Sequence, residues 1–251
     1  MLIPAGFEVV VEKEAGYLFV ERCQEAALQL AATHGATLHS EETVVDWKSN
    51  GTSVDVTTDK SKYSAGSLVL TAGAWTNQLL HQLNVPLRVI RKLMTWHKSS
   101  AWSQDSLAGG RVGDRVFYFE LPDGEFYGVP TSDDELVKLA YHSGGMNVPN
   151  PLTLDRACHP ADLKPLADFI RHHLPGVSAD PVRHAVCMYT STPDGHFVID
   201  QHPEFDNVIV GAGFSGHGFK FASVLGSALA DLSLNSRTDH AIDFLRLKRF
   251  E

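Results

Sequence analysis

Six residues near the C-terminal end of the chain, Gly211-Ala212-Gly213-Phe214-Ser215-Gly216, have the spacing GxGxxG between a predicted strand and a predicted helix. Such a turn aims backbone N–H groups and the positive end of a helix at an electron-rich ligand. A dinucleotide-binding unit also needs a second strand, with an acidic residue about 20 positions on. The segment 233–238 is a polar loop, so this unit is not completed. The turn is predicted to bind an electron-rich group, with a purely structural tight turn as the alternative; an NAD-dependent dehydrogenase is disfavoured.

Two other groups of reactive side chains have simpler explanations. Ser215 is followed two positions later by His217, so the G-x-S-x-G spacing of a hydrolase nucleophile is absent. His172 and His173 are adjacent at the end of a helix predicted over 160–174, where the helix dipole favours cations. A solvated helix end explains this pair better than a metal site, and no metal is predicted.

The cysteines and the charge limit the class of protein further. Cys23, Cys158 and Cys187 form no CxxC pair, which argues against a disulfide framework and a zinc site and favours the reducing cytoplasm. The 251 residues carry a formal net charge of −9 without a basic cluster, which argues against nucleic acid as a partner. No signal peptide is predicted, and no apolar stretch approaches the roughly 20 residues that cross a membrane.

The elements that must position these residues fall into two groups. The first group predicts an α/β layer. It consists of a helix ending at Gly35, a hairpin turning at Asn50-Gly51, and a buried strand over 67–71 that is followed by a helix over 75–83. Between about 88 and 145 the pattern changes to antiparallel strands, predicted over 89–97, 115–120, 125–129 and 136–142. Strands over 184–190, 197–200 and 207–210 and a final helix over 216–232 complete the chain. The predicted fold class is therefore α+β or α/β, with the layer formed by residues 1–90 and 194–251 and the antiparallel sheet by 91–193.

Several blocks of the sequence point to one family. They are Cys187-Met188-Tyr189-Thr190, Thr192-Pro193-Asp194, His196-Phe197-Val198-Ile199-Asp200 and Gly213-Phe214-Ser215-Gly216-His217-Gly218-Phe219-Lys220-Phe221-Ala222. Together they resemble monomeric sarcosine oxidase and N-methyl-tryptophan oxidase, a family of flavin amine oxidases in the D-amino-acid-oxidase superfamily. Further matches in family order are Leu70–Trp75, Tyr127–Pro130, Lys138–His142 and Leu245–Phe250.

The resemblance implies that 1–90 and 194–251 form an FAD-binding domain and 91–193 a substrate domain. Members of the family begin with a strand–GxGxxG–helix unit that holds the ADP part of FAD, followed by an arginine-bearing loop over the flavin. This sequence starts after both, so the FAD-binding layer is expected to be incomplete. The missing strand is expected to leave an unpaired sheet edge, which allows an oligomer.

Family resemblance also implies roles in binding FAD. Cys187 resembles the cysteine that forms a thioether to the flavin ring, a reaction that needs its thiolate. His217 and the neighbouring glycines are expected along the ring edge that becomes negative on reduction. Val44, Ala72 and Gly73 are expected to contact the nucleotide part of FAD. The complete set of expected cofactor contacts is Cys187, Gly213, Ser215, Gly216, His217, Gly218, Val44, Ala72 and Gly73.

The remaining roles concern catalysis and the substrate. Lys138 resembles the lysine that helps oxygen accept electrons, and His142 a histidine near the substrate amine. Positions i and i+4 of a strand share a face, so both can point into one pocket, which Tyr127 would line. Lys220 resembles the lysine that binds the substrate carboxylate, with Tyr189 nearby. His217 and Lys220, three residues apart at the predicted helix start, are expected to share one helix face.

The implied reaction is oxidation of a secondary amino acid by FAD and molecular oxygen. For an N-methyl substrate the products are formaldehyde, the primary amino acid and hydrogen peroxide. Sarcosine, N-methyl-tryptophan and cyclic imino acids such as pipecolate remain open as substrates. The alternative is a non-catalytic remnant of the family that does not hold flavin alone.

Overall fold

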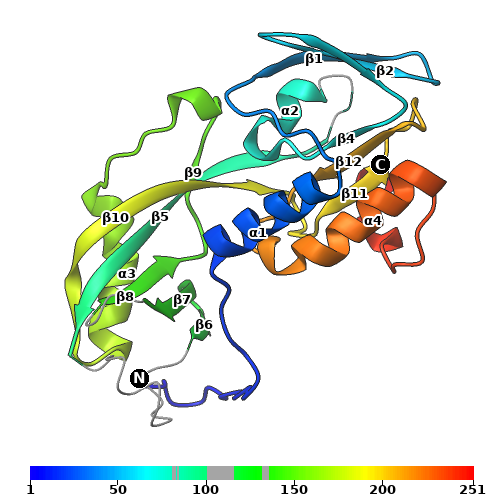
Figure 1. Cartoon of the computed structure of the whole chain (residues 1–251). Helices are drawn as coiled ribbons and strands as arrows, with labels where there is room; N and C mark the ends of the chain where they lie inside the picture. The colour runs from blue at the N-terminus through cyan, green and yellow to red at the C-terminus, as the bar shows by residue number, and fades with distance from the viewer. Residues whose placement is uncertain (81–82, 84, 101–115, 132–135) are drawn as a thin grey trace. The chain divides into compact units, whose positions relative to one another are not determined.

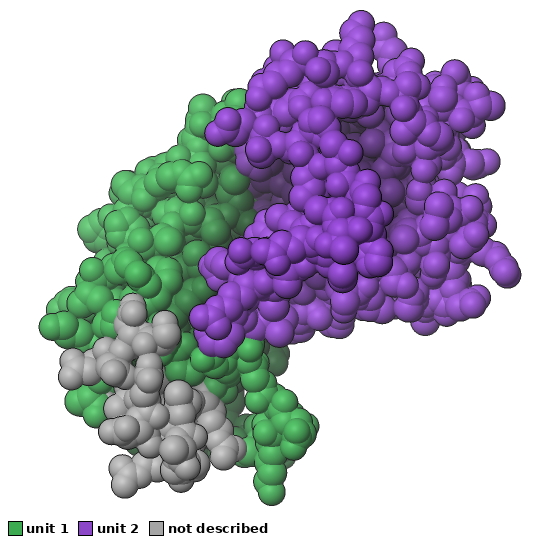
Figure 2. Space-filling view, viewed as in Figure 1, with its two compact units in different colours: residues 1–17, 90–188 green, residues 18–89, 189–251 purple. Residues whose placement is uncertain are grey.

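The computed structural model describes all residues except 81–82, 84, 101–115 and 132–135 (Figure 1). The chain forms two compact units (Figure 2): Met1–Tyr17 with Ile90–Met188, called unit 1, and Leu18–Val89 with Tyr189–Glu251, called unit 2. The first 17 residues thus belong to unit 1, whereas the sequence pattern grouped them with residues 18–90. Leu2 explains this placement, because its N–H donates to the carbonyl of His173 at 2.8 Å. The assignment of cofactor and substrate to separate domains stays a prediction.

A six-stranded sheet forms the centre of unit 1, in the order β10-β5-β8-β7-β6, with β9 also paired to β5 (Figure 1). The strands are β5 (Arg88–Ser99), β6 (Phe117–Leu121), β7 (Gly124–Pro130), β8 (Leu136–Tyr141), β9 (Met146–Asn147) and β10 (Val177–Ser191). The pairs β5–β8, β7–β8 and β6–β7 are antiparallel. The antiparallel sheet that the sequence predicts is therefore present.

The helix α3 (Pro160–His173) covers one face of this sheet and closes the core of unit 1. The ring of Phe169 in the helix stacks on the ring of Phe126 in β7, with centroids 4.3 Å apart. Val137 and Leu139 of β8 are fully buried in the same cluster. Since side chains of a strand alternate between faces, the intervening residues of β8 lie on the face away from α3.

Unit 2 contains two three-stranded sheets. The first is an antiparallel meander of β1 (Val44–Ser49), β2 (Val54–Thr58) and β3 (Lys62–Ala65). The second has the order β11-β12-β4, with β11 (Val198–Gln201), β12 (Val208–Ala212) and β4 (Leu68–Leu70), and its β12–β4 pair is parallel. An α/β layer with a parallel strand pair agrees with the predicted fold class.

Both faces of the central strand β12 are covered, and all five of its residues are buried. Val208 and Val210 pack into the cluster that contains Trp47, whereas Ile209 packs under α4 (Ala222–Asn235). Buried strands with two covered faces are typical of α/β layers. The helix α1 (Val20–Thr33) differs, since none of its residues, all of which are described, is buried.

Some predicted boundaries are wrong. The helix predicted over 216–232 begins at Ala222, after a turn and the short 3₁₀ segment η5 (Phe219–Phe221). The helix predicted over 75–83 is described as η1 (Gly73–Trp75) and α2 (Thr76–Leu79), while 81–82 lie outside the described residues. Left-handed backbone at Gly213, Ser215 and Gly216 delays the last helix, because an α-helix requires negative φ. Among the described residues, no helix has the length and apolar character needed to cross a membrane.

Candidate active site

The face of the unit 1 sheet that lies away from α3 carries four of the predicted site residues. Lys138 on β8 lies between the buried residues Val137 and Leu139, so its side chain points away from the helix. His142 follows β8, and its N–H still donates to the carbonyl of Glu125 on β7 at 2.7 Å. The strand geometry therefore continues to His142, and the shared face expected for Lys138 and His142 is present.

Lys138 lies beside an aromatic ring. Trp96 of β5 is the cross-strand neighbour of Lys138, and the Lys138 Nζ lies 5.6 Å from the Trp96 ring centroid. The guanidinium carbon of Arg183 on β10 lies 4.2 Å from the same centroid. A cation over an indole is stabilised by about 0.5–2 kcal/mol. Two cations next to one ring make this part of the face attractive to an anion or to a group that gains negative charge.

Aromatic and acidic groups surround His142. Its ring centroid lies 6.1 Å from that of Tyr118 and 6.4 Å from that of Tyr127. Its Nε2 lies 3.9 Å from the Glu125 carboxylate. Tyr127 thus belongs to the same cluster, as expected from the sequence. The carboxylate keeps a proton acceptor close to the imidazole, and the rings limit where the imidazole can move.

Cys187 reaches this face from β10. Its thiol is half-buried, and burial raises its pKa above the ordinary value, while the nearby Lys138 and Lys92 oppose that shift. The thiol is therefore protonated at neutral pH, and the two ammonium groups favour the thiolate when it forms. Cys23 is exposed on α1, and burial raises the pKa of the half-buried Cys158 thiol. All three cysteines, which lie in described segments, are free.

Sequence reasoning missed Lys92, which lies almost completely buried on β5. A buried lysine is rare unless its charge is compensated, so the burial of Lys92 indicates that other groups stabilise its ammonium. The signal was available in Arg91-Lys92-Leu93-Met94, where an alternating strand pattern puts Lys92 on the face of Trp96.

The glycine-rich turn of unit 2 follows β12 and has an unusual backbone. Ser215 has a φ of 48°, a conformation that non-glycine residues rarely adopt. Its N–H donates to the carbonyl of Thr190 at 2.9 Å, and its Oγ lies 3.0 Å from the carbonyl of Gly213. The serine hydroxyl thus has a structural role in this turn, in which Gly216 is exposed and Gly218 is half-buried.

Donors remain available in this turn. Within the described part of the chain, the backbone N–H groups of Gly216 and Gly218 have no hydrogen-bond acceptor. The His217 Nδ1 lies 3.1 Å from the Ser215 carbonyl, which only accepts, so Nδ1 carries the hydrogen of this bond. These two N–H groups and the imidazole could bind a planar ring along an edge that carries hydrogen-bond acceptors.

His217 and Lys220 line one cavity of about 370 Å³, together with Phe197 and Phe221. They are brought together here by a turn and a 3₁₀ segment, since regular α-helix begins later. The Lys220 Nζ lies 5.8 Å from the Phe221 ring centroid, and its side chain is exposed. The prediction of a shared helix face is therefore wrong in its geometry, although the two residues are neighbours.

Tyr189 of β10 packs against the glycine-rich turn. A Cβ built on Gly216 would lie 2.2 Å from the Tyr189 ring, and Gly216 has a φ of 78°. We expect Gly216→Ala to lower the free energy of unfolding of unit 2 by about 1–3 kcal/mol, because it adds backbone strain and displaces the ring. Chemical denaturation measures this loss.

Gly226→Ala in α4 is the matched control, because a Cβ there meets no described atom within 4 Å. This substitution should stabilise the helix by about 0.5–1 kcal/mol. Equal stabilities of the two variants would contradict the argument from Tyr189.

The expected nucleotide contacts lie on two elements of unit 2. Val44 begins β1 and is exposed. Ala72 precedes η1, and Gly73 begins it with a φ of 53°, where an added Cβ meets no described atom within 4 Å. Their contact with a nucleotide stays a prediction.

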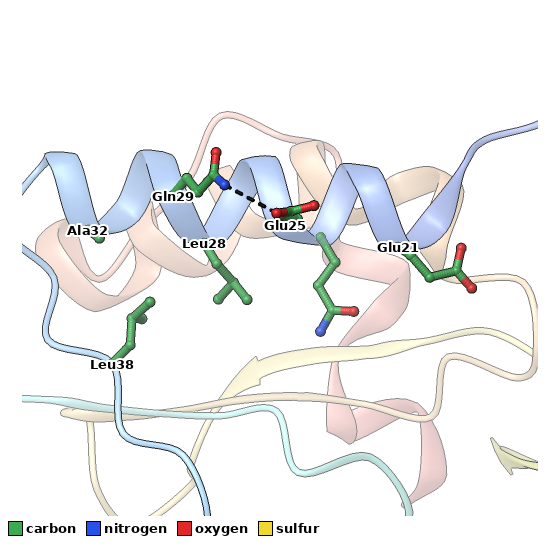
Figure 3. A pocket seen from close by; sticks show the side chains of 7 residues that line it. Glu21, Glu25, Leu28, Gln29, Ala32 and Leu38 are labelled. Atoms are coloured by element: carbon green, nitrogen blue, oxygen red, sulfur yellow. Dashed lines mark hydrogen bonds between the residues drawn. The ribbon is translucent and has the colours of Figure 1, made fainter.

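A shallow pocket on α1 lies outside all predicted sites (Figure 3). Its volume is about 410 Å³, and its lining is largely apolar, with Leu28 and Leu38 pointing into it. Glu25 at its rim accepts a hydrogen bond from Gln29 at 3.3 Å. Among the described residues, no group of three or more metal-binding side chains occurs, here or elsewhere.

Comparison with known proteins identifies the family. The model of the family described as DAO, FAD dependent oxidoreductase, matches residues 5–232. The chain belongs to this family. Monomeric sarcosine oxidase of Bacillus sp. (strain NS-129) is 36% identical over 98% of this chain and 64% of its own length. N-methyl-L-tryptophan oxidase of Yersinia pestis (strain Pestoides F) is 33% identical over 99% of this chain and 65% of its own length.

A solved structure supports the fold assignment of this DAO-family chain. NikD, an amino acid oxidase essential for nikkomycin biosynthesis, superposes with a TM-score of 0.73 at 26% identity. The match covers 90% of this chain and 59% of NikD. The DAO-family chain therefore spans less than two thirds of the length of these relatives.

The FAD named in the family description fits the chemistry of residues present in the DAO-family chain. The glycine-rich turn offers backbone donors without a partner among the described residues, and the sheet face of unit 1 offers a thiol whose pKa two nearby ammonium groups lower. Within unit 2 the backbone donors suit the carbonyl edge of a ring, and within unit 1 the thiol suits attack on an electron-poor ring once it forms a thiolate.

Proposed function

We propose that this chain carries the substrate face and part of the flavin site of an oxidase of secondary amino acids. The proposed substrates are N-methyl amino acids such as sarcosine or N-methyl-tryptophan, with hydrogen peroxide, formaldehyde and the primary amino acid as products. The observation that carries the proposal is the cluster of Lys138, His142, Tyr127 and Cys187 on one face of the unit 1 sheet. The names of the relatives supply the substrate class.

The proposed roles of residues in unit 1 follow from the charges of their side chains and from their positions on the sheet face. FAD, when bound, supplies the two-electron redox chemistry. Lys138 holds a fixed positive charge that stabilises the negative charge developing on oxygen. His142 orients the substrate amine, and its imidazole has the Tyr127 ring and the Glu125 carboxylate as neighbours. Cys187 is the proposed point of covalent attachment to the flavin.

The proposed roles of residues in unit 2 concern the substrate carboxylate, the flavin ring edge and the nucleotide part of FAD. Lys220 binds the substrate carboxylate by charge, with Tyr189 nearby, and both belong to the segment around the glycine-rich turn. His217 and the N–H groups of Gly216 and Gly218 hold the ring edge that becomes negative. Gly213 and Ser215 act through the shape of the turn. Val44, Ala72 and Gly73 are proposed contacts of the nucleotide part.

Visible absorption of the purified chain after soaking in FAD tests the proposal. Precipitation with acid should leave flavin absorbance in the pellet, because a thioether survives denaturation. Cys187→Ser should release the absorbance into the supernatant, whereas Cys158→Ser, which replaces another half-buried free thiol, should not. A chain that stays colourless after soaking contradicts the proposed function. Hydrogen peroxide release with sarcosine, N-methyl-tryptophan and pipecolate then ranks the substrates.

A further inference from the structure

Lys92 makes an unusual set of hydrogen bonds. Its side chain is 5% exposed, and its Nζ lies 2.5 Å from the carbonyl oxygen of His142, 2.8 Å from that of Ser143 and 2.5 Å from that of Gly144. Three consecutive backbone carbonyls thus converge on one amine. An ammonium has three N–H donors and a neutral amine two, so this arrangement requires the charged form.

The three carbonyls belong to the turn that connects β8 with β9. Gly144 and Gly145 have φ values of 61° and 112°, a backbone that turns the carbonyls toward β5. A Cβ on Gly145 would lie 2.5 Å from the Ile90 Cγ2, so the turn packs closely on that strand. The Ser143 Oγ accepts the N–H of Glu125 at 3.0 Å. The turn is therefore held by Lys92 from β5 and by Glu125 from β7.

We propose that Lys92 is a positioning residue, whose ammonium holds the turn 142–144 and thereby fixes where the His142 imidazole points. The inference rests on the proposed function, in which His142 orients the substrate amine. Lys92 acts through the backbone of the turn and needs no contact with substrate. His142, which carries the imidazole, is the first of the three residues whose carbonyls bind Lys92. A shift of the turn therefore moves the imidazole directly.

The charge of Lys92 depends on pH within an accessible range. Burial lowers its pKa to about 8, while Cys187 from β10 and Glu125 from β7 oppose this shift. The part of the chain that the structure describes places further charged or titratable groups on this sheet face, from β8 and its extension, β10, β7 and β6: Lys138, His142, Arg183, Tyr127 and Tyr118. Above its pKa Lys92 loses one of three donors, so the turn should loosen as the pH rises through about 8.

Amide hydrogen exchange, normalised for the intrinsic effect of pH, measures the hold on the turn. We expect protection of the His142 amide to fall about tenfold or more between about pH 7 and about pH 9, the size expected for losing a charge-assisted hydrogen bond. The amide of Leu139, in the middle of β8, should keep its protection. Lys92→Arg, which stays charged, should remove the pH dependence, and Lys92→Met should give low protection throughout.

The imidazole gives a second readout. The His142 Hε1 chemical shift senses the rings of Tyr118 and Tyr127, so it should change in Lys92→Met and stay near the wild-type value in Lys92→Arg. Constant protection of His142 across the pH range in the wild type, or an equal fall at Leu139, would overturn the proposal. Neither measurement needs bound flavin, so failure of the proposed function is distinguishable. The pH series on the wild-type protein tests the proposal even if a variant does not fold.

Discussion

Replacing Arg91 by methionine is expected to lower the free energy of unfolding of unit 1 by about 3–5 kcal/mol, the usual loss when one partner of a buried ion pair is removed. Arg91 is 4% exposed, and its Nη1 lies 2.9 Å from the Asp162 carboxylate in the first turn of α3. It also donates to the carbonyls of Asp155, at 2.7 Å, and Ala157. The substitution leaves all three acceptors without this donor, in the segment where α3 begins.

Lys164→Met is the control for Arg91→Met. Lys164 pairs with Asp168 at 2.7 Å on the exposed side of the same helix. An exposed pair contributes about 0.3–0.5 kcal/mol, so this variant should unfold close to the wild-type denaturant concentration. Denaturation followed by tryptophan fluorescence, to which Trp96 of unit 1 contributes, compares the two variants. Similar losses of unfolding free energy in both variants would show that burial of the Arg91 ion pair adds nothing to the stability of unit 1.

The second large effect is expected on catalysis. Lys138→Met should slow the uptake of electrons by oxygen about 100- to 1000-fold, the size measured when one preorganised electrostatic group is removed. The reduction of bound flavin by substrate without oxygen should change far less, because Lys138 is proposed to act on the oxygen step. Stopped-flow absorbance separates the two half-reactions in the flavin-loaded enzyme.

Lys98→Met provides the matched control, since Lys98 is an exposed lysine on β5 of the same sheet. Its rate with oxygen should equal that of the wild type. An equal slowing of both half-reactions in Lys138→Met would assign the residue to folding or flavin binding instead.

Local pattern was sufficient for much of the sheet in unit 1. The pattern over 136–142 predicts a strand, and the observed β8 ends at Tyr141, one residue before His142. Its covered face is the one that carries the buried Val137 and Leu139. The neighbours of Lys138 were not predictable, because Trp96 comes from a strand 42 positions away whose register depends on tertiary pairing. Residue types alone do not specify cross-strand partners.

Other features depend on contacts that a linear pattern does not contain. The late start of α4 follows from left-handed backbone at Ser215, a residue that seldom adopts it. The role of Lys92 depends on a turn distant in sequence folding onto β5. Strand alternation indicates which face Lys92 shares, but a lysine in a strand usually faces water, so its burial follows from the pairing of the strands and not from that pattern.

The exposure of α1 has a consequence for the cooperativity of unfolding. A helix of 14 residues without a buried side chain gains little from the core, and isolated helices shorter than about 12–15 residues are marginal in water. Heating should therefore melt α1 gradually, before the two sheets of unit 2 lose their packing. The loss of helical circular dichroism and the change in tryptophan fluorescence, to which the buried Trp47 contributes, would then follow different curves. A two-state analysis would underestimate the enthalpy of unfolding of unit 2.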